Sequence, residues 1–314
     1  MAEIREITAG LRFPEGPVAM PDGSVLLVEI ERRTLTRVWP DGRQDIVARP
    51  GGGPNGLAIG PSNAAFVTNN GGFTFHEDQD GVRPTTQAAD YDGGRLERVD
   101  LATGEVTVLT AETGTGHRLK GPNDLVVDRE GGIWFTDLGK RRARDLDYGG
   151  VYWLSPDRRT IREIAHPFLT PNGIGLSPDE KTLYVAETEG ARLWAFDITG
   201  PGEIRHHPWP SPHGGRLLYA AGGALQRYDS LAVEACGNIC VATLLEGGIT
   251  VVSPEGRLVE FVPMPDRYTT NICFGGPDLR TAYITLSQGG RLVATEWPRA
   301  GLPLNFLNSR ESAL

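Results

Sequence analysis

Six copies of one short pattern run through this chain of 314 residues, and they constrain its fold more than any other feature. Each copy has a polar residue, a short apolar run, a turn containing Gly, Pro or Asp, and a second apolar run. The polar residues that begin the copies are Glu15, Asn55, Asn123, Asn172, Asp229 and Asn271. They are spaced 40, 68, 49, 57 and 42 residues apart, near the roughly 40–50 residues of a β-propeller blade.

Further strand-like pairs follow the copies, such as TLTRVWPDGRQDIVA (34–48) and GVYWLSPDRRTIREIA (150–165). Turns of the type PDG suit hairpins between antiparallel strands, and no sustained helical periodicity is present. We therefore predict an all-β fold, a six-bladed β-propeller. We expect residues 1–314 to form a single domain, because one blade alone cannot bury both of its faces.

The repeat also predicts where the polar residues meet. The first strand of each propeller blade lines the central channel, so the six polar residues are expected to form one ring. The second apolar runs end at Glu29, Asn69, Asp137, Glu187, Thr243 and Thr285. The loops that follow them, including the long segment 69–92 and the segment 137–150, are expected at the ring's end of the channel. We predict that segment 69–92 is a lid, while turns such as PDG lie at the opposite end.

The chemistry of the ring favours a divalent cation. Two carboxylates and four amides converge there without Lys or Arg, and unpaired buried carboxylates are costly. Calcium prefers such oxygen ligands, so Glu15, Asn172 and Asp229 are the candidate metal set. Asn123 is either a ligand or a substrate contact. Asn before a strand is also a common turn residue, and Asn55 and Asn271 either contact substrate or only line the channel.

Two residues outside the ring are further candidates for substrate binding. His76 lies in the long insertion and is placed to overhang the site, and Lys140 opens a basic run that could attract an anionic substrate. An exposed surface position is the alternative for both.

Composition excludes several classes of protein. The formal net charge of −9 argues against nucleic-acid binding, and no apolar run is long enough to span a membrane. Three cysteines do not suggest a disulfide framework. No signal peptide is visible, so we expect a cytoplasmic protein. The sequence contains neither a GxSxG nucleophile turn nor a GxxxxGK[ST] phosphate loop, and oligomeric state stays open.

Several longer motifs resemble one family. FPEGPV (13–18), GPNDLVVD (121–128), TPNGIGLSPDEKTLYVAET (170–188), YDSLAVEACGNICVA (228–242) and CFGGPDLRTAYIT (273–285) resemble the SMP-30/gluconolactonase family of calcium-dependent six-bladed propellers, which includes regucalcin and luciferin-regenerating enzymes. The resemblance implies metal ligands at Glu15, Asn172 and Asp229, with Asn123 as a further ligand or a substrate contact, and Asp229 as the candidate base. Gly121 stands where regucalcin-like members carry a substrate-binding Arg.

The function expected from this resemblance is a metal-dependent lactonase that opens a sugar lactone or a related small lactone to its hydroxy acid. Its cofactor would be one divalent cation, with Ca²⁺ preferred and Zn²⁺, Mg²⁺, Mn²⁺ and Fe²⁺ as alternatives. Other readings are a phosphotriesterase resembling diisopropyl-fluorophosphatase, a strictosidine-synthase-like propeller, and a non-catalytic calcium-binding propeller that docks proteins.

Overall fold

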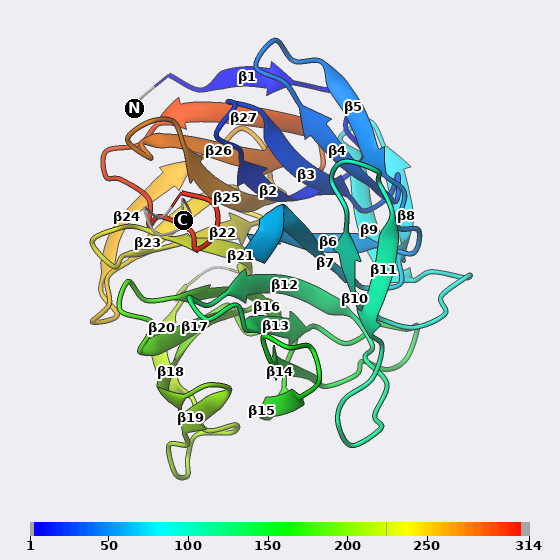
Figure 1. Ribbon diagram of the computed structural model, residues 1–314. Helices are drawn as coiled ribbons and strands as arrows, with labels where there is room; N and C mark the ends of the chain where they lie inside the picture. The colour runs from blue at the N-terminus through cyan, green and yellow to red at the C-terminus, as the bar shows by residue number, and fades with distance from the viewer. Residues whose placement is uncertain (1–2, 224, 309–314) are drawn as a thin grey trace.

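The computed structural model describes residues 3–223 and 225–308, and its strands form six blades around a central axis (Figure 1). Within this part of the chain the one helical element is a 3-10 turn, Pro61–Asn63. The prediction of an all-β, six-bladed propeller is confirmed.

Each blade is an antiparallel sheet of four strands, and the fourth blade carries one more strand. From the axis outward, the blades are: first, β2 (Pro14–Ala19), β3 (Val25–Glu29), β4 (Thr34–Val38), β5 (Gln44–Ala48); second, β6 (Pro54–Gly60), β7 (Ala64–Asn69), β10 (Arg95–Val99), β11 (Val106–Thr110); third, β12 (Pro122–Val127), β13 (Ile133–Asp137), β14 (Gly149–Leu154), β15 (Ile161–Phe168). The remaining blades are: fourth, β16 (Pro171–Leu176), β17 (Thr182–Glu187), β18 (Arg192–Gly200), with β19 (Glu203–Arg205) and β20 (Arg216–Ala220) both paired to β18; fifth, β21 (Arg227–Val233), β22 (Ile239–Leu244), β23 (Gly248–Val252), β24 (Leu258–Pro263); sixth, β25 (Thr269–Gly275), β26 (Thr281–Leu286), β27 (Arg291–Glu296), β1 (Arg5–Thr8).

The ring of blades closes through the N-terminal end of the chain. The innermost strands contact one another in the order β2, β6, β12, β16, β21, β25 and back to β2. The outer strand of the sixth blade is β1, which pairs with β27 so that Arg5 lies opposite Ala294. Figure 1 shows β1 beside β27 at the edge of the molecule. The sequence analysis did not predict this closure.

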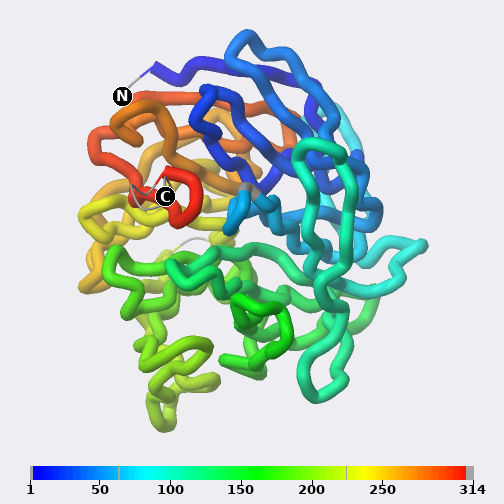
Figure 2. The backbone as a smooth tube through the Cα atoms, in the orientation of Figure 1, coloured from blue at the N-terminus to red at the C-terminus, as the bar shows by residue number. Residues whose placement is uncertain are grey.

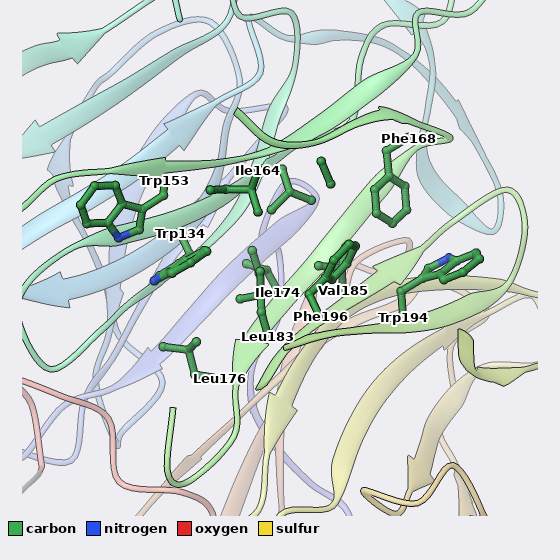
Figure 3. Packing of buried hydrophobic residues seen from close by; sticks show 12 residues of the cluster. Trp134, Trp153, Ile164, Phe168, Ile174, Leu176, Leu183, Val185, Trp194 and Phe196 are labelled. Carbon is green, nitrogen blue, oxygen red and sulfur yellow. The ribbon is translucent and has the colours of Figure 1, made fainter. Parts of the chain in front are cut away.

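Apolar side chains fill the spaces between neighbouring blades. Between the third and fourth blades, Trp134, Phe168, Trp194 and Phe196 pack with aliphatic residues of the inner strands (Figure 3). Successive residues of a strand point to opposite faces, so a blade packed on both faces has apolar residues in both directions. Burying one large apolar side chain contributes about 1.5–3 kcal/mol, and these contacts hold the inner strands in place.

The two ends of the channel are covered differently. The insertion in the second blade, predicted as a lid, forms a hairpin of β8 (Phe73–Asp78) and β9 (Gly81–Gln87). At the opposite end the chain returns to the inner strands near its C-terminus, where Leu302 donates its N–H to the Val233 carbonyl at 2.8 Å. Figure 2 shows this last stretch, in red, beside the centre of the propeller. No helix in the described residues has the length and apolar character needed to cross a bilayer.

Candidate active site

The predicted ring residues all stand at the beginning of an innermost strand. In four blades a proline precedes the ring residue and is the first residue of the strand; these prolines are Pro14, Pro54, Pro122 and Pro171. Proline fixes φ and has no N–H to pair, so it suits the first residue of a strand. Five ring residues are 2–5% exposed, and Asp229 keeps more of its surface exposed; the five are Glu15, Asn55, Asn123, Asn172 and Asn271.

Glycines after ring residues let neighbouring inner strands approach closely. A Cβ on Gly173 would lie 2.7 Å from both the Asp229 carbonyl oxygen and the Leu231 nitrogen. A Cβ on Gly56 would lie 2.7 Å from the Asn123 carbonyl oxygen. A side chain at these positions would push adjacent blades apart, so the glycines keep the ring narrow.

Hydrogen bonds connect ring residues across blade boundaries. Asn271 in the sixth blade donates its amide to Glu15 in the first blade at 2.8 Å. Asn172 in the fourth blade lies close enough to Asp229 in the fifth to lower the pKa of that carboxyl. The ring therefore contains two amides that act on carboxyls of residues far apart in the sequence.

The carboxyls of the ring repel one another in a poorly hydrated space. Burial raises the pKa of Glu15 well above its ordinary value, and the charge of Asp229 raises it further. Burial also raises the pKa of Asp229 to about 7, an effect opposed by the Asn172 hydrogen bond and reinforced by the charge of Asp124. Buried carboxyls without a positive neighbour show this behaviour.

The donor set fits a hard cation. The Oδ1 atom of Asn123 is buried and has no hydrogen-bond partner among the described residues, and buried polar atoms rarely lack one. Together with Glu15, Asn172 and Asp229 it would supply the oxygen ligands that calcium prefers. In the described part of the chain no group of three or more His, Cys, Asp or Glu side chains is arranged to hold a metal, so such a site would depend on the amides.

Lys140 lies inside the protein rather than at its surface. It is fully buried, and its Nζ donates to the carbonyls of Asn70 at 2.8 Å and Gly72 at 2.7 Å. Nζ also lies 4.0 Å from the centroid of the Phe73 ring, a favourable cation–π distance. Burial lowers the pKa of Lys140 to about 7. In this arrangement the ammonium contacts the base of the hairpin and leaves no surface for a substrate, so its predicted role in substrate binding gains no support.

Lys140 is nevertheless connected to the ring through one residue. Asn70, whose carbonyl it binds, donates its side-chain amide to the Oδ1 atom of Asn55 at 2.8 Å. This bond occupies Asn55, which the sequence analysis gave as a substrate contact or a channel-lining residue. The geometry favours the second role for Asn55, and direct contact with substrate stays a prediction.

The β8–β9 hairpin crosses from the second blade to its neighbours on both sides. Val82 donates its N–H to the Gln288 carbonyl of the sixth blade at 2.9 Å, and Gln87 donates to the Arg141 carbonyl of the third at 2.9 Å. The Phe75 ring packs 5.6 Å from that of Phe13, which lies two residues before Glu15. These contacts support the prediction of a lid at this end of the channel.

His76 lies on the opposite face of this hairpin from Phe75, because neighbours in a strand point in opposite directions. Its side chain is half exposed, and Nε2 lies 3.2 Å from the Asp78 carboxylate. The structure does not bring His76 to the ring, so its contact with substrate stays a prediction.

Comparison with known proteins adds an independent observation. The model of a family described as "SMP-30/Gluconolactonase/LRE-like region" matches residues 13–288. The chain belongs to this family. A gluconolactonase of Zymomonas mobilis is 27% identical over 323 aligned residues, covering 93% of this chain and 81% of that protein.

Two solved structures similar to this SMP-30/gluconolactonase-like chain share its fold. One is a gluconolactonase of Xanthomonas campestris, with a TM-score of 0.74, 24% identity, and coverage of 95% of this chain and 90% of that one. The other is regucalcin of Agrobacterium tumefaciens, described as a calcium-binding protein, with a TM-score of 0.75, 20% identity and 98% coverage of both chains.

Polar residues at the ends of second strands fix the ring of this SMP-30/gluconolactonase-like propeller, a role that was not predicted from the sequence. Asp137, at the end of β13, accepts the N–H groups of Lys120 and Gly121 at 2.7 Å each, just before Asn123. The ends of the second strands in the first two blades do the same: Glu29 accepts the Arg12 N–H at 2.7 Å, and Asn69 accepts the Gly53 N–H at 2.8 Å. The sequence did contain a signal for this role, because the second apolar runs of these blades end in polar residues.

Asp124 is a second missed residue of this family member. It is buried, its carboxylate accepts a hydrogen bond from the Leu125 N–H at 2.8 Å, and polar groups of Ser230 and Ile174 act on it to lower its pKa. It thereby joins the inner strands of the third, fourth and fifth blades beside three ring residues. Burial raises the pKa of Asp124 to about 7.

On the far side of the ring lies a cavity of about 370 Å³. Its walls are mainly apolar residues of the inner strands, with Asp124 and Asn271 nearest the ring, and the segment from Leu302 to Leu307 lines its outer end. The oxygen donors that suit lactone chemistry belong to the ring itself, so we place the candidate site there rather than in the apolar cavity.

Proposed function

We propose that this chain is a lactonase that depends on one divalent cation, calcium by preference, and opens a small lactone to its hydroxy acid. The observation that carries the proposal is the ring: two carboxylates and a buried, unpartnered amide oxygen converge, and within the described part of the chain no Lys or Arg is hydrogen-bonded to these carboxylates. Membership of the SMP-30/gluconolactonase/LRE-like family and the similarity to a named gluconolactonase support the same reaction.

Glu15, Asn172, Asp229 and Asn123 would hold the cation, because the charge of Asp229 acts on Glu15, Asn172 acts on Asp229, and the Asn123 Oδ1 atom has no hydrogen-bond partner among the described residues. A bound cation supplies polarisation of the lactone carbonyl and stabilisation of the negative charge that develops on its oxygen. Gly16 and Asn271 donate hydrogen bonds to Glu15 at 2.7 and 2.8 Å, which fixes the orientation of that carboxylate.

Asp229 is the proposed proton acceptor. Asp229 is more exposed than the other ring residues, which lets water approach, and the neighbouring Asn172 favours its charged form. As the water oxygen bonds to the carbonyl carbon, one water proton passes to Asp229. When the acyl carbon–oxygen bond within the lactone breaks, that proton moves to the leaving alkoxide, giving the hydroxy acid. A base positioned in this way contributes typically about 10²–10⁴-fold.

The proposal is tested first by a panel of sugar and aliphatic lactones together with a fluorophosphate, with and without added calcium. We expect calcium-dependent turnover of at least one lactone. Turnover of the fluorophosphate alone would favour the phosphotriesterase reading, and activity toward no compound in the panel would favour a non-catalytic calcium-binding propeller.

Two matched variants then separate the roles of the carboxylates. Asp229→Asn and Glu15→Gln both keep an oxygen for the cation, but only Asp229 is the proposed base. At saturating calcium we expect Asp229→Asn to lose on the order of 10²-fold or more in kcat, while Glu15→Gln recovers most activity. A calcium-loaded Asp229→Asn enzyme with wild-type kcat would refute the assignment of the base.

A further inference from the structure

Three charged side chains from three blades meet at the ring's end of the channel. The Arg141 guanidinium, from the connection between β13 and β14, pairs with one carboxylate oxygen of Glu189. The other carboxylate oxygen of Glu189 accepts a hydrogen bond from Nη2 of Arg227 at 3.1 Å. We call these residues the Arg141–Glu189–Arg227 cluster, which joins the third, fourth and fifth blades.

The cluster lies close to the candidate donor set. Arg227 begins β21 and stands two residues before Asp229. Glu189 follows Thr188, whose hydroxyl accepts the side-chain amide of Asn172 at 3.0 Å. The three blades that carry the cluster also carry Asn123, Asn172 and Asp229, so the cluster is the charged surface next to these donors.

Arg227 is a charged exception at its position in the repeat. The residues two positions before the other ring residues carry no charge; they are Phe13, Gly53, Gly121, Thr170 and Thr269. Two guanidiniums share the single carboxylate of Glu189, so the cluster has a net charge of about +1 in a chain whose formal net charge is −9. Neither guanidinium is hydrogen-bonded to a ring carboxylate, so this excess charge is left for another anionic partner.

The cluster also has unused hydrogen-bonding capacity. The Nε atom of Arg227 is buried and has no partner among the described residues, and an unsatisfied buried donor costs about 1–3 kcal/mol. The side chains of Arg141 and Arg227 are 46% and 34% exposed, so a solute can reach them. A guanidinium presents its donors as a planar fork that matches a carboxylate, sulfonate or phosphate.

We propose that the Arg141–Glu189–Arg227 cluster binds an anionic group of the substrate, so that the chain prefers lactones bearing an acidic substituent. This inference rests on the proposed lactonase function and adds to it the class of substrate. The same chemistry would recognise the carboxylate that forms when the lactone opens. Comparing the preference among substrates with the binding of the product distinguishes an acidic substituent of the substrate from this product carboxylate.

The test compares two lactones that differ in one group. D-Glucono-δ-lactone is neutral, and D-glucaro-δ-lactone has a carboxylate in place of the hydroxymethyl group. We expect Arg227→Gln to lower kcat/KM for the acidic lactone about 10- to 100-fold, as expected when a hydrogen bond to a charged group is lost, and to change the neutral lactone far less. Glu189→Gln, which leaves both guanidiniums unpaired, should shift the preference further toward the acidic lactone.

Arg142→Gln is the matched control. Arg142 belongs to the same connection and carries the same charge, but it pairs locally with Asp145 and Asp147. We expect this control to keep the wild-type ratio of kcat/KM between the two lactones.

Three outcomes would overturn the inference: equal losses of kcat/KM on both lactones in Arg227→Gln, the same loss in Arg142→Gln, or a wild-type preference for the neutral lactone. Circular dichroism of each variant confirms folding, and Arg227→Lys, which keeps the charge but not the fork, replaces Arg227→Gln if that variant is unfolded.

A separate binding measurement distinguishes failure of the proposed lactonase function from failure of the proposed anion site. If wild type hydrolyses no lactone of the panel, the proposed function fails, and titration calorimetry with D-glucarate in wild type and Arg227→Gln still tests the cluster. Weaker binding of D-glucarate to Arg227→Gln would support an anion site, and equal affinities would refute it. If the neutral and acidic lactones bind alike while D-gluconate binding falls in Arg227→Gln, the cluster recognises the product carboxylate and the proposed substrate preference is wrong.

Discussion

Lys140 offers a direct test of how the base of the hairpin is held. Its ammonium is fully buried, against two backbone carbonyls and beside the aromatic rings of Phe73 and Tyr91. Burial lowers its pKa from 10.5 to about 7, although the charges of Asp137 and Asp147 act in the opposite direction. The perturbation is Lys140→Met, which removes the charge and keeps most of the side-chain volume.

The sign of the effect follows from proton binding. Between pH 7 and 10.5 the unfolded chain holds a proton on Lys140 that the folded protein has lost, so the free energy of unfolding rises with pH in this window. The slope reaches at most about 1.4 kcal/mol per pH unit. From pH 7 to pH 9.5 the stability of wild type relative to Lys140→Met should therefore increase by about 3 kcal/mol. Groups present in both proteins cancel in the difference.

The measurement is urea unfolding followed by tryptophan fluorescence at several pH values between 6 and 9.5. Lys120→Met is the control, because it makes the same chemical change at an exposed lysine. The difference between wild type and this control should stay flat. If the difference between wild type and Lys140→Met is equally flat, the ammonium is not held in the buried position that the structure shows.

Three further predictions concern the ring, the hairpin and the cation. Gly173→Ala should lower the free energy of unfolding by about 1–3 kcal/mol, because its Cβ would meet backbone atoms of Asp229 and Leu231 at 2.7 Å. The control is Gly222→Ala, whose Cβ meets nothing within 4 Å. Equal stabilities of the two variants in urea would contradict the close approach of the strands. Replacing Phe73–Gln87 with a short Gly-containing turn should change the ratio of kcat/KM values among lactones more than it changes the melting temperature, and an unchanged ratio would show that the hairpin is no lid. Removing divalent cations with a chelator should lower the melting temperature, and calcium should restore it, because a cation that binds only the folded ring stabilises it; full activity and the same melting temperature without metal would refute the cation site.

Features that repeat along the chain could be predicted from the sequence. The six polar residues and the apolar runs behind them recur with the period of a blade, so blade number and the convergence of Glu15, Asn172 and Asp229 followed from a local pattern. The close approach of neighbouring inner strands also left a local signal, because Gly16, Gly56 and Gly173 directly follow ring residues.

Features that depend on distant partners could not be predicted in this way. Lys140 looked like part of an exposed basic run, and only the fold shows that its ammonium binds the carbonyl of Asn70, 70 residues earlier in the chain. The role of Asp124 likewise depends on Ser230 and Ile174 in two other blades. Local periodicity indicates which face of a strand is buried, but it does not indicate which atoms of another blade lie against that face.

The pairing of β1 with β27 has a consequence for the synthesis of the protein. A ribosome makes β1 long before β27, so Arg5 is synthesised well before Ala294, its neighbour across the finished sheet. At about 5–20 residues per second this delay lasts on the order of tens of seconds. Throughout that time β1 lacks its pairing partner, and the unpaired backbone groups of a strand can pair with another chain and cause aggregation. A circularly permuted gene that encodes β1 directly after β27 would remove the delay, and the yield of soluble protein in a cell should then depend less on chaperones.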